Sequence, residues 1–451
     1  MENKKFSRRQ ILAAGTAGAI GTMAVWPLDS YSIGSSPQGK LALLGGEKIH
    51  KGGWPSWPVW NQAAEKDIAE MYRTGRWFYG AGEHVADFEK LYAELVGAKR
   101  CVTTSSGTTA LLTALYVCGV DAGDEVIVAP YTFIATYNAV LQQKALPVFA
   151  DTDPETILIN PKTIEGKITD RTSAILPVHI YGFPCAMDAI VKIAQKHNLK
   201  VVEDACQAWF AEYKGKKTGT WGDAGCFSFQ NSKNLPAGEG GAITTNNEEF
   251  ADRCWSFRNV GRSFGKFKDA PANSFRGTNF RMQQVQALVL MSQLQRVKSD
   301  DEIRQANAKY LNSKLKQIPG IIPYKMTDPS NISALHVFPF RYIQEKFGNV
   351  PKEKFLRALN AEGIHAGVGY GPQNKDGLFE EAFASKGFKR LYSEARLKQW
   401  RDENLHLPGN DQVCKEAVTF GQNILLGSRQ DMDDIVNAIT KVYENRASLL
   451  A

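Results

Sequence analysis

The stretch GDAGCFSFQNSKNLPAGEGGAITT, residues 222–245, decides the fold class of this 451-residue chain. It contains two short apolar runs, 225–229 and 242–245, with the length expected of buried strands. A loop rich in glycine, asparagine and proline joins the two runs and carries Lys233 soon after the first. We therefore expect two strands of one sheet, with a lysine just beyond the end of the first strand.

Upstream, five further strand candidates alternate with helical patterns such as 108–117 and 187–197. This alternation is typical of βαβ units and a parallel sheet. The sequence thus predicts an α/β fold with a mainly parallel seven-stranded sheet and flanking helices. The five upstream candidates are residues 101–104, 125–129, 146–150, 173–178 and 200–203.

The segments before and after the predicted sheet differ from it in composition and in hydrophobic pattern. A Pro/Trp-rich segment, GGWPSWPVW at 52–60, is expected to pack irregularly against the body. One long helix is predicted over 282–315, followed by signals for further strands and helices. We expect a large α/β domain over residues 41–300, including the N-terminal segment, and a smaller C-terminal α+β domain over 301–451.

The first 35 residues have the pattern of an export signal. Adjacent arginines, Arg8 and Arg9, precede an apolar stretch at 11–26 and resemble the twin-arginine signal. The stretch is too short and too rich in glycine for a stable membrane span. A basic tail before an ordinary helix is the alternative. The pattern favours a signal peptide over residues 1–35 and export, in the periplasm, by the twin-arginine route.

The charge of the chain gives little indication of its partners. The formal net charge is +7, from 54 basic and 47 acidic side chains, and the basic residues form no stripe. We therefore expect no nucleic-acid partner. The seven cysteines have no metal-like or C-x-x-C spacing, so we expect small buried side chains and no metal site.

The segment SSGTT at 105–109 lies between a predicted strand and a helix. Ligands bind at the carboxyl ends of strands in open α/β sheets. Backbone N–H groups at a helix start hold phosphate, helped by the helix dipole. Ser and Thr at a helix start are also common N-caps, so both interpretations stay open.

The segment LKVVEDA ends a predicted strand on Glu203 and Asp204, with Gln207 three residues beyond. An acid that closes a buried strand needs a cationic partner, because burying an unpaired charge is costly. A protonated pyridine nitrogen would serve as that partner. A structural salt bridge would serve equally well.

Lys233 precedes the sequence GEGG at 238–241. A lysine amine in a partly desolvated site has a lowered pKa and forms Schiff bases, although a lysine after a strand is usually at the surface. The segment PYTF at 130–133 offers an aromatic ring that could lie flat on a heterocycle or join the core. Phosphate cradle, stacking ring, acid and lysine together predict pyridoxal 5'-phosphate as the cofactor.

The order of these motifs resembles a known family, the DegT/DnrJ/StrS sugar aminotransferases. The resemblance covers roughly residues 41–443 and implies the type I aspartate-aminotransferase fold of pyridoxal-phosphate enzymes. The stretches that carry it are GRWFYGAGEHVADFEKLYAELVGAK (75–99), SSGTTALLTAL (105–115), DEVIVAPYTFIATYNAV (124–140), VEDACQAW (202–209), GDAGCFSFQNSKNLPAGEGGAI (222–243) and GTNFRMQQVQALVLMSQL (277–294).

The resemblance implies a role for each matching residue. Lys233 would form the internal aldimine and carry the proton, and it argues against the branch of the family that replaces lysine with histidine. Asp204 would pair with the pyridine N–H⁺ and keep the ring an electron sink. Gln207 would contact the cofactor face near the ring hydroxyl, and Phe133 would stack on the ring.

The remaining implied contacts concern the phosphate. Gly107, Thr108 and Ser228 would hold it within one subunit. Asn279, in the motif G-x-N-x-R-M, would reach the phosphate of the neighbouring subunit. The resemblance therefore implies a homodimer with sites at the interface.

Two departures from the family pattern concern the substrate. Val260 stands where many members carry a histidine, and residues 370–374 read YGPQN where many have Y-x-P-x-H. These positions serve substrate more than cofactor. The SFQNSK variant and the GGW-x-x-WP-x-W segment favour members that act on ketocyclitols and related rings.

The implied reaction is a ping-pong transamination from glutamate or glutamine to a ketosugar or ketocyclitol. Because nucleotide sugars are made in the cytoplasm, export favours an acceptor without a nucleotide. Two alternatives remain. One is a non-catalytic, exported ketosugar-binding or sensor protein that keeps the fold. The other is a different pyridoxal-phosphate enzyme, such as a lyase.

Overall fold

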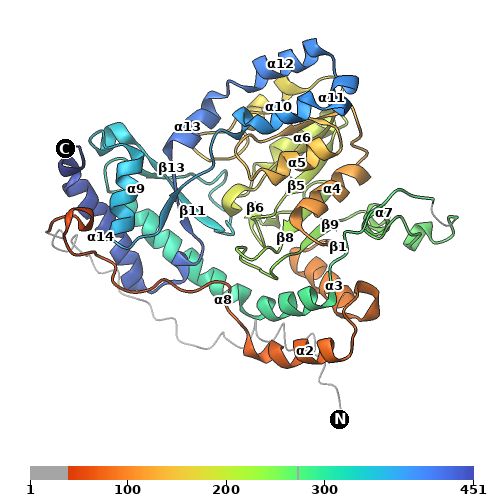
Figure 1. Ribbon diagram of the computed structural model, residues 1–451, viewed down its shortest axis with the longest axis horizontal. Coiled ribbons are helices and arrows are strands. Elements are labelled where there is room, and N and C mark those ends of the chain that lie inside the picture. The colour runs from red at the N-terminus through yellow and green to blue at the C-terminus, as the bar shows by residue number, and fades with distance from the viewer. Residues whose placement is uncertain (1–38, 272–273, 451) are drawn as a thin grey trace.

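The computed structural model describes residues 39–271 and 274–450, and the proposed signal at 1–35 lies outside them. Its centre is the expected seven-stranded sheet, in the order β1-β9-β8-β5-β4-β2-β3 (Figure 1). All neighbours pair in parallel except β9, which is antiparallel to β1 and β8. The strands are β1 Arg100–Thr104, β2 Glu125–Val128, β3 Leu146–Phe149, β4 Thr172–Leu176, β5 Lys200–Asp204, β8 Ala224–Ser228 and β9 Gly241–Thr245.

Both faces of this sheet are covered, which explains why its strands read as continuous apolar runs. Side chains alternate between the faces. Val126 and Val128 of β2 pack in one hydrophobic cluster with α4 and α5, while Ile127 packs in another with α6. The helices of this part are α2 Gln62–Arg73, α3 His84–Val96, α4 Gly107–Val117, α5 Ala135–Gln142, α6 Met187–Lys196 and α7 Glu248–Arg258, and a two-stranded hairpin pairs β6 Glu212–Tyr213 with β7 Lys216–Lys217.

A second, antiparallel sheet lies towards the C-terminus, in the order β10-β11-β13-β12. Residues of helices α9 and α14 share its hydrophobic cluster. This is the expected smaller α+β part. Its elements are β10 Ile321–Pro323, β11 Val337–Tyr342, α9 Lys352–Ala361, β12 Ala366–Val368, α13 Pro408–Glu416, β13 Ala417–Gly421 and α14 Arg429–Glu444.

Helix α8, Gln284–Leu315, is shared by the two parts. Leu290 packs with the cluster beside β8, whereas Leu311 packs with the C-terminal cluster. The boundary expected at residue 300 therefore falls inside one helix, and the division into two domains stays a prediction. None of the helices in the described residues has the length and apolar character that a membrane crossing requires.

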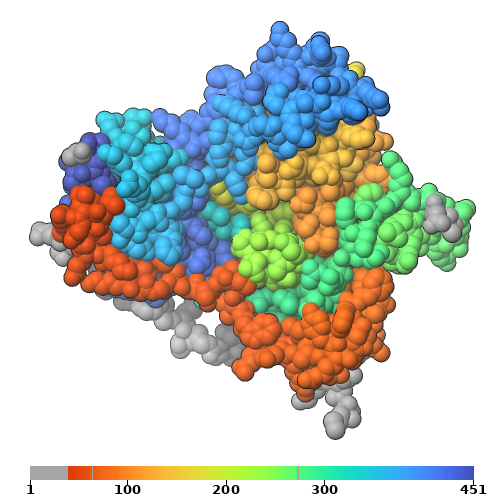
Figure 2. Space-filling model, viewed as in Figure 1, coloured from red at the N-terminus to blue at the C-terminus, as the bar shows by residue number. Residues whose placement is uncertain are grey.

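Near both ends of the chain, residues pack in a different part of the molecule from the one that their place in the sequence suggests. Leu41 packs in the C-terminal cluster, far along the chain from its neighbours there. Three C-terminal helices instead cover the large sheet through Phe379, Phe388 and Trp400, in the upper blue part of Figure 2. These helices are α10 Gly377–Ala384, α11 Lys386–Leu391 and α12 Glu394–Asn404.

Candidate active site

The predicted site residues follow the carboxyl ends of β1, β2, β5 and β8. This edge of a parallel sheet is where helix N-termini and loops converge on a ligand. Gly107 opens α4 after β1, Phe133 follows β2, Asp204 ends β5 and Lys233 lies beyond β8. Asn279 comes from a different place, the segment after α7.

The start of α4 is built as an anion site. Ser106 caps the helix: its hydroxyl accepts the Thr109 N–H at 3.2 Å. A Cβ added at Gly107 would lie 2.7 Å from the Ser228 Cβ and 2.8 Å from the Cys206 sulfur. The missing side chain thus lets β8 and the 204–207 turn approach the helix start. Within the described residues, the Gly107 and Thr108 N–H groups have no hydrogen-bond acceptor, so they are available to a phosphate.

Asp204 is buried without a cation. Its carboxyl group is 5% exposed and accepts the Thr136 hydroxyl at 2.8 Å and the Cys206 N–H at 3.1 Å. No salt bridge to Asp204 occurs in ranges 39–271 and 274–450. A buried carboxylate with two donors and no cation suits a ligand that brings an N–H⁺. The structural salt bridge considered above therefore does not account for Asp204.

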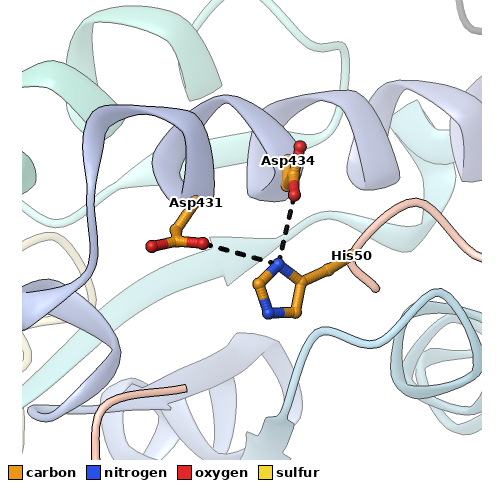
Figure 3. Close-up of side chains that lie close together, drawn as sticks. All are labelled: His50, Asp431 and Asp434. Atoms are coloured by element: carbon orange, nitrogen blue, oxygen red, sulfur yellow. Dashed lines mark hydrogen bonds and ion pairs between the residues drawn. The ribbon is translucent and has the colours of Figure 1, made fainter. Parts of the chain in front are cut away.

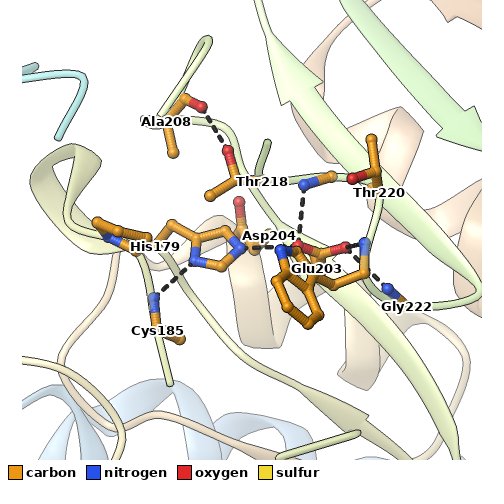
Figure 4. A network of polar contacts seen from close by, with 12 residues as sticks. His179, Cys185, Glu203, Asp204, Ala208, Thr218, Thr220 and Gly222 are labelled. Carbon is orange, nitrogen blue, oxygen red and sulfur yellow. Dashed lines mark hydrogen bonds and ion pairs between the residues drawn. The ribbon is translucent and has the colours of Figure 1, made fainter. Parts of the chain in front are cut away.

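Glu203, the preceding residue, has the structural role instead (Figure 4). Its fully buried carboxylate accepts three backbone N–H groups of the loop 219–222, at 2.7 to 2.9 Å. His179 Nε2 lies 3.0 Å from the same carboxylate, and His179 Nδ1 accepts the Cys185 N–H. His179 therefore donates from Nε2. Because side chains alternate along β5, the two neighbouring acids face different surroundings.

The Lys233 amine is enclosed and has no hydrogen-bond partner among the described residues. Its Nζ lies 5.9 Å from the centre of the Trp209 ring. Burial lowers the pKa of Lys233, while the neighbouring Cys206 and Asp204 oppose that shift. The backbone is fixed: the Lys233 N–H donates to Gln230 O at 2.9 Å. An amine with a lowered pKa and no partner is suited to Schiff-base chemistry.

A histidine that the sequence did not single out completes the wall around Lys233. His336 lies edge-on to Trp209 with ring centres 5.6 Å apart, and its Nδ1 is 3.2 Å from the Asn234 amide oxygen. Burial lowers the pKa of His336 well below its ordinary value, and the charges of Lys233 and Arg304 act in the same direction. Both effects favour the neutral form of His336. Lys233 is then the group of this wall that can carry a positive charge.

Gln207 has both ends of its amide engaged. Its oxygen accepts the Tyr181 N–H at 2.8 Å, and its nitrogen donates to the Tyr370 hydroxyl at 3.1 Å. Tyr181 and Tyr370 stack with ring centres 5.6 Å apart. The C-terminal part of the chain thus reaches the 204–207 turn through Tyr370, and the predicted contact of Gln207 with the cofactor stays a prediction.

Phe133 and Asn279 are placed at the surface. Phe133 is 52% exposed, and no other aromatic ring of the described part packs against it. Asn279 is exposed and lies in an isolated bridge with Asn259. The Asn279 segment follows α7, which stands out from the body at one edge of Figure 1.

The two departures from the family pattern differ in accessibility. Val260 is 45% exposed and has φ 56°, a strained value for a β-branched residue. Asn374 is fully buried, and its amide donates to Asn404 O at 2.8 Å. Of these two positions, Val260 alone has an exposed side chain.

The residues present fit pyridoxal phosphate. Free N–H groups at the start of α4, the uncompensated Asp204 carboxylate and the unpartnered Lys233 amine correspond to its phosphate, pyridine nitrogen and aldehyde. Sequence reasoning missed Thr136 and Trp209. Thr136 lies in the first turn of α5 and shares a hydrogen bond of 2.7 Å with Thr132 of the preceding loop.

Comparison with known proteins identifies a family and relatives of the whole chain. The model of the DegT/DnrJ/EryC1/StrS aminotransferase family matches residues 60–420. L-glutamine:2-deoxy-scyllo-inosose aminotransferase of Streptomyces lividus is 33% identical over 424 residues, which cover 91% of this chain and 99% of that protein.

Two solved structures are similar as well. 3-Amino-5-hydroxybenzoic acid synthase superposes with a TM-score of 0.76 and 26% identity, covering 87% of this chain and 99% of that one. NtdA from Bacillus subtilis, solved with bound cofactor PMP, has a TM-score of 0.70 and 25% identity, covering 85% and 83%.

Proposed function

Since the chain belongs to the DegT/DnrJ/EryC1/StrS aminotransferase family and is a pyridoxal-phosphate-dependent enzyme, we propose that it moves an amino group from glutamine to a ketocyclitol. The observation that carries the reaction type is the half-buried Lys233, whose amine has no hydrogen-bond partner among the described residues and lies near Asp204. The glutamine:inosose relatives support the donor and the acceptor class. Glutamate and ketosugars are the alternatives that the experiment below compares.

The cofactor and the protein residues would have different roles in the reaction. Pyridoxal phosphate, when bound, supplies the aldehyde that takes up the amino group and the ring that accepts electrons. Gly107, Thr108 and Ser228 would hold its phosphate. Asp204 would keep a proton on the ring nitrogen, because its buried carboxylate forms no salt bridge within the described residues.

Lys233 would do the proton transfer. When it is not bonded to the cofactor, the Lys233 amine would act as a base in a desolvated position, where burial lowers its pKa. In the first half-reaction Lys233 would move a proton from the donor Cα to the C4′ carbon of the cofactor, and in the second it would move one from C4′ to the acceptor carbon. General acid–base transfer by such a positioned group contributes roughly 10²–10⁴-fold in rate.

The reaction is tested one half at a time. The pyridoxal form is mixed with glutamine or glutamate, and the change of cofactor absorbance gives the rate. The pyridoxamine form is then screened with scyllo-inosose, 2-deoxy-scyllo-inosose, free 3-ketoglycosides and nucleotide ketosugars for return of that absorbance. We expect glutamine and an inosose to react fastest. Lys233→Ala should abolish both half-reactions.

The outcomes separate the alternatives. No half-reaction with any donor in the loaded protein would favour an exported sugar-binding protein. Loss of an amino-acid substituent without formation of the 2-oxo acid would favour a lyase. A strict requirement for nucleotide ketosugars would exclude a free cyclic ketone as acceptor.

The proposal includes a homodimer in which Asn279 completes the phosphate site of the partner subunit. Its exposed position on the segment after α7 supports this, since a residue that serves a second subunit must be accessible on its own.

We also propose export through the twin-arginine route, in the periplasm, on the basis of the sequence at 1–35 alone. Fractionation of cells that express the full chain and an Arg8→Lys/Arg9→Lys variant tests this. We expect the full chain in the periplasmic fraction and the variant retained in the cytoplasm. Equal distribution of the two would exclude this route.

A further inference from the structure

A segment at the N-terminus lies across the molecule and ends at the catalytic lysine. We name residues 50–60 the N-terminal strap. Among the described contacts, the Pro55 carbonyl accepts the Asn423 amide and the Val59 carbonyl accepts the Gln293 amide, each at 2.8 Å. In Figure 2 the red-to-orange N-terminal part passes from the blue C-terminal helices to the yellow-green part of the chain.

His50 fastens the strap to α14 (Figure 3). The side chain is buried, with Nδ1 3.1 Å from Asp434 Oδ2 and 3.7 Å from Asp431 Oδ1. These three groups are close enough to hold a metal ion. Asp431, however, also accepts the Ser428 N–H at 2.6 Å as a helix cap. His50 also stacks on Trp54 at 4.2 Å, so the group is accounted for as an anchor of the strap.

Trp57 is the strap residue that touches Lys233. Its indole N–H donates to the Lys233 carbonyl oxygen at 3.0 Å, between residues 176 positions apart. Two guanidinium groups of α8 lie near the indole ring, Arg296 at 5.6 Å and Arg304 at 5.1 Å from the ring centre. Arg304 is 1% exposed and is itself held by the Gln422 amide oxygen at 3.0 Å. The direction of the indole N–H is therefore fixed by a buried neighbour.

The backbone around Lys233 is held from three sides. Its N–H donates to Gln230 O and its carbonyl accepts from Trp57, while the side-chain amide of the next residue, Asn234, donates to Ala334 O at 2.7 Å. The amine at the end of the side chain has no such partner in the described chain. The main chain is thus fixed while the reacting atom is free, which suits an amine that must leave and re-enter one position.

We infer that Trp57 is a positioning residue for Lys233: its indole N–H fixes the lysine carbonyl and so sets where the amine lies. The inference rests on the proposed function, in which Lys233 is the reacting amine. A misplacement of about 1 Å at a reacting group can cost roughly 10²-fold in rate. Release of one of three backbone anchors should cost less, roughly tenfold.

Trp57→Phe tests the inference, with Trp54→Phe as the matched control. Phenylalanine keeps an aromatic ring near the two arginines and removes the N–H donor, and the loss of ring size is the same in both variants. Trp54 lies in the same strap and donates an equivalent bond, to Gly363 O at 3.0 Å, far from the lysine. Both variants lose one indole-to-carbonyl hydrogen bond, so their thermal unfolding temperatures should fall by similar amounts.

Two measurements on the enzyme with bound pyridoxal phosphate distinguish an effect on the position of Lys233 from an effect on the stability of the fold. For Trp57→Phe we expect the maximal rate of the glutamine half-reaction to fall roughly tenfold, with the half-saturating glutamine concentration within about twofold. We expect the bound cofactor to be lost roughly tenfold faster after dilution, measured by its absorbance, because the lysine holds it less well. Trp54→Phe should leave both unchanged.

The inference is overturned if Trp57→Phe matches the wild type in both measurements, or if Trp54→Phe changes them equally. It is also overturned if only the half-saturating concentration changes. If the wild type shows no half-reaction with any donor, the proposed function fails, while the rate of cofactor loss still decides the role of Trp57.

Discussion

At the scale of a residue, Glu203 and Asp204 of β5 show that adjacent acids have different roles because their surroundings differ. Asp204 has two hydrogen-bond donors and no cation, whereas Glu203 is saturated by three backbone N–H groups and a histidine. Each is a buried carboxylate in the same strand. We therefore assign chemistry to the first and stability to the second.

Replacing each acid by its amide should separate these roles. Asp204→Asn removes the charge opposite the ring nitrogen, and we expect both half-reactions to slow by roughly 10²-fold, with little change in stability. Glu203→Gln places an NH₂ group against N–H donors, and we expect it to lower the free energy of unfolding by about 3 kcal/mol. Urea unfolding and half-reaction rates check this; a reversed pattern would exchange the two assignments.

The start of α4 offers a second prediction for single residues. Gly107→Ala would bring a Cβ to 2.7 Å from the Ser228 Cβ, so the cradle must open and the affinity for pyridoxal phosphate should fall roughly tenfold or more. At Gly166 a Cβ meets nothing within 4 Å, so Gly166→Ala is the control. Fluorescence titration of the apo-protein measures both affinities, and equal affinities would remove Gly107 from the cradle.

At the scale of elements, helices α10–α12 belong in space with the large sheet. Trp400 of α12 is 1% exposed, and its indole N–H donates to the carbonyl oxygen of Pro147 in β3. The C-terminal third of the chain thus helps to enclose the sheet that carries the site. Fold and site are stabilised together by this packing.

Trp400→Ala tests that packing. We expect the free energy of unfolding to fall by about 3–5 kcal/mol, because a large buried side chain leaves a cavity. Leu405 at the end of the same helix is 41% exposed, so Leu405→Ala should stay within about 0.5 kcal/mol of the wild type. Similar losses for both variants would show that α12 adds little to the core of the sheet.

At the scale of the whole molecule, the proposed dimer predicts that two defective subunits can restore each other. Lys233 and Asn279 would serve the same site from different chains. In a mixed dimer of Lys233→Ala and Asn279→Ala subunits, one of the two sites then carries both residues. Random pairing should give about a quarter of the wild-type activity.

Co-expression of differently tagged subunits measures this recovery. The control pairs Lys233→Ala with the Lys233→Ala/Asn279→Ala double variant, which cannot form an intact site in either arrangement. Activity of the co-expressed pair no higher than that of Asn279→Ala alone would mean that Asn279 does not complete a partner's site.

The sequence by itself determined the fold class and the cofactor. Apolar runs and helical periods are local signals, and they located all seven strands of the large sheet to within about two residues. Because parallel strands end at one edge, residues after β1, β2, β5 and β8 had to converge there. Gly107, Ser228, Asp204 and Lys233 could therefore be grouped without coordinates.

Only the tertiary structure decided which distant residues support that site. Trp57 reaches Lys233 across 176 positions, Tyr370 reaches Gln207 across 163, and α12 packs on the large sheet from the far end of the chain. Such long-range pairs cannot be recognised from a local sequence pattern, because each side chain is also compatible with an ordinary strap, loop or helix. Their partners are chosen by the packing of whole elements, which periodicity does not encode.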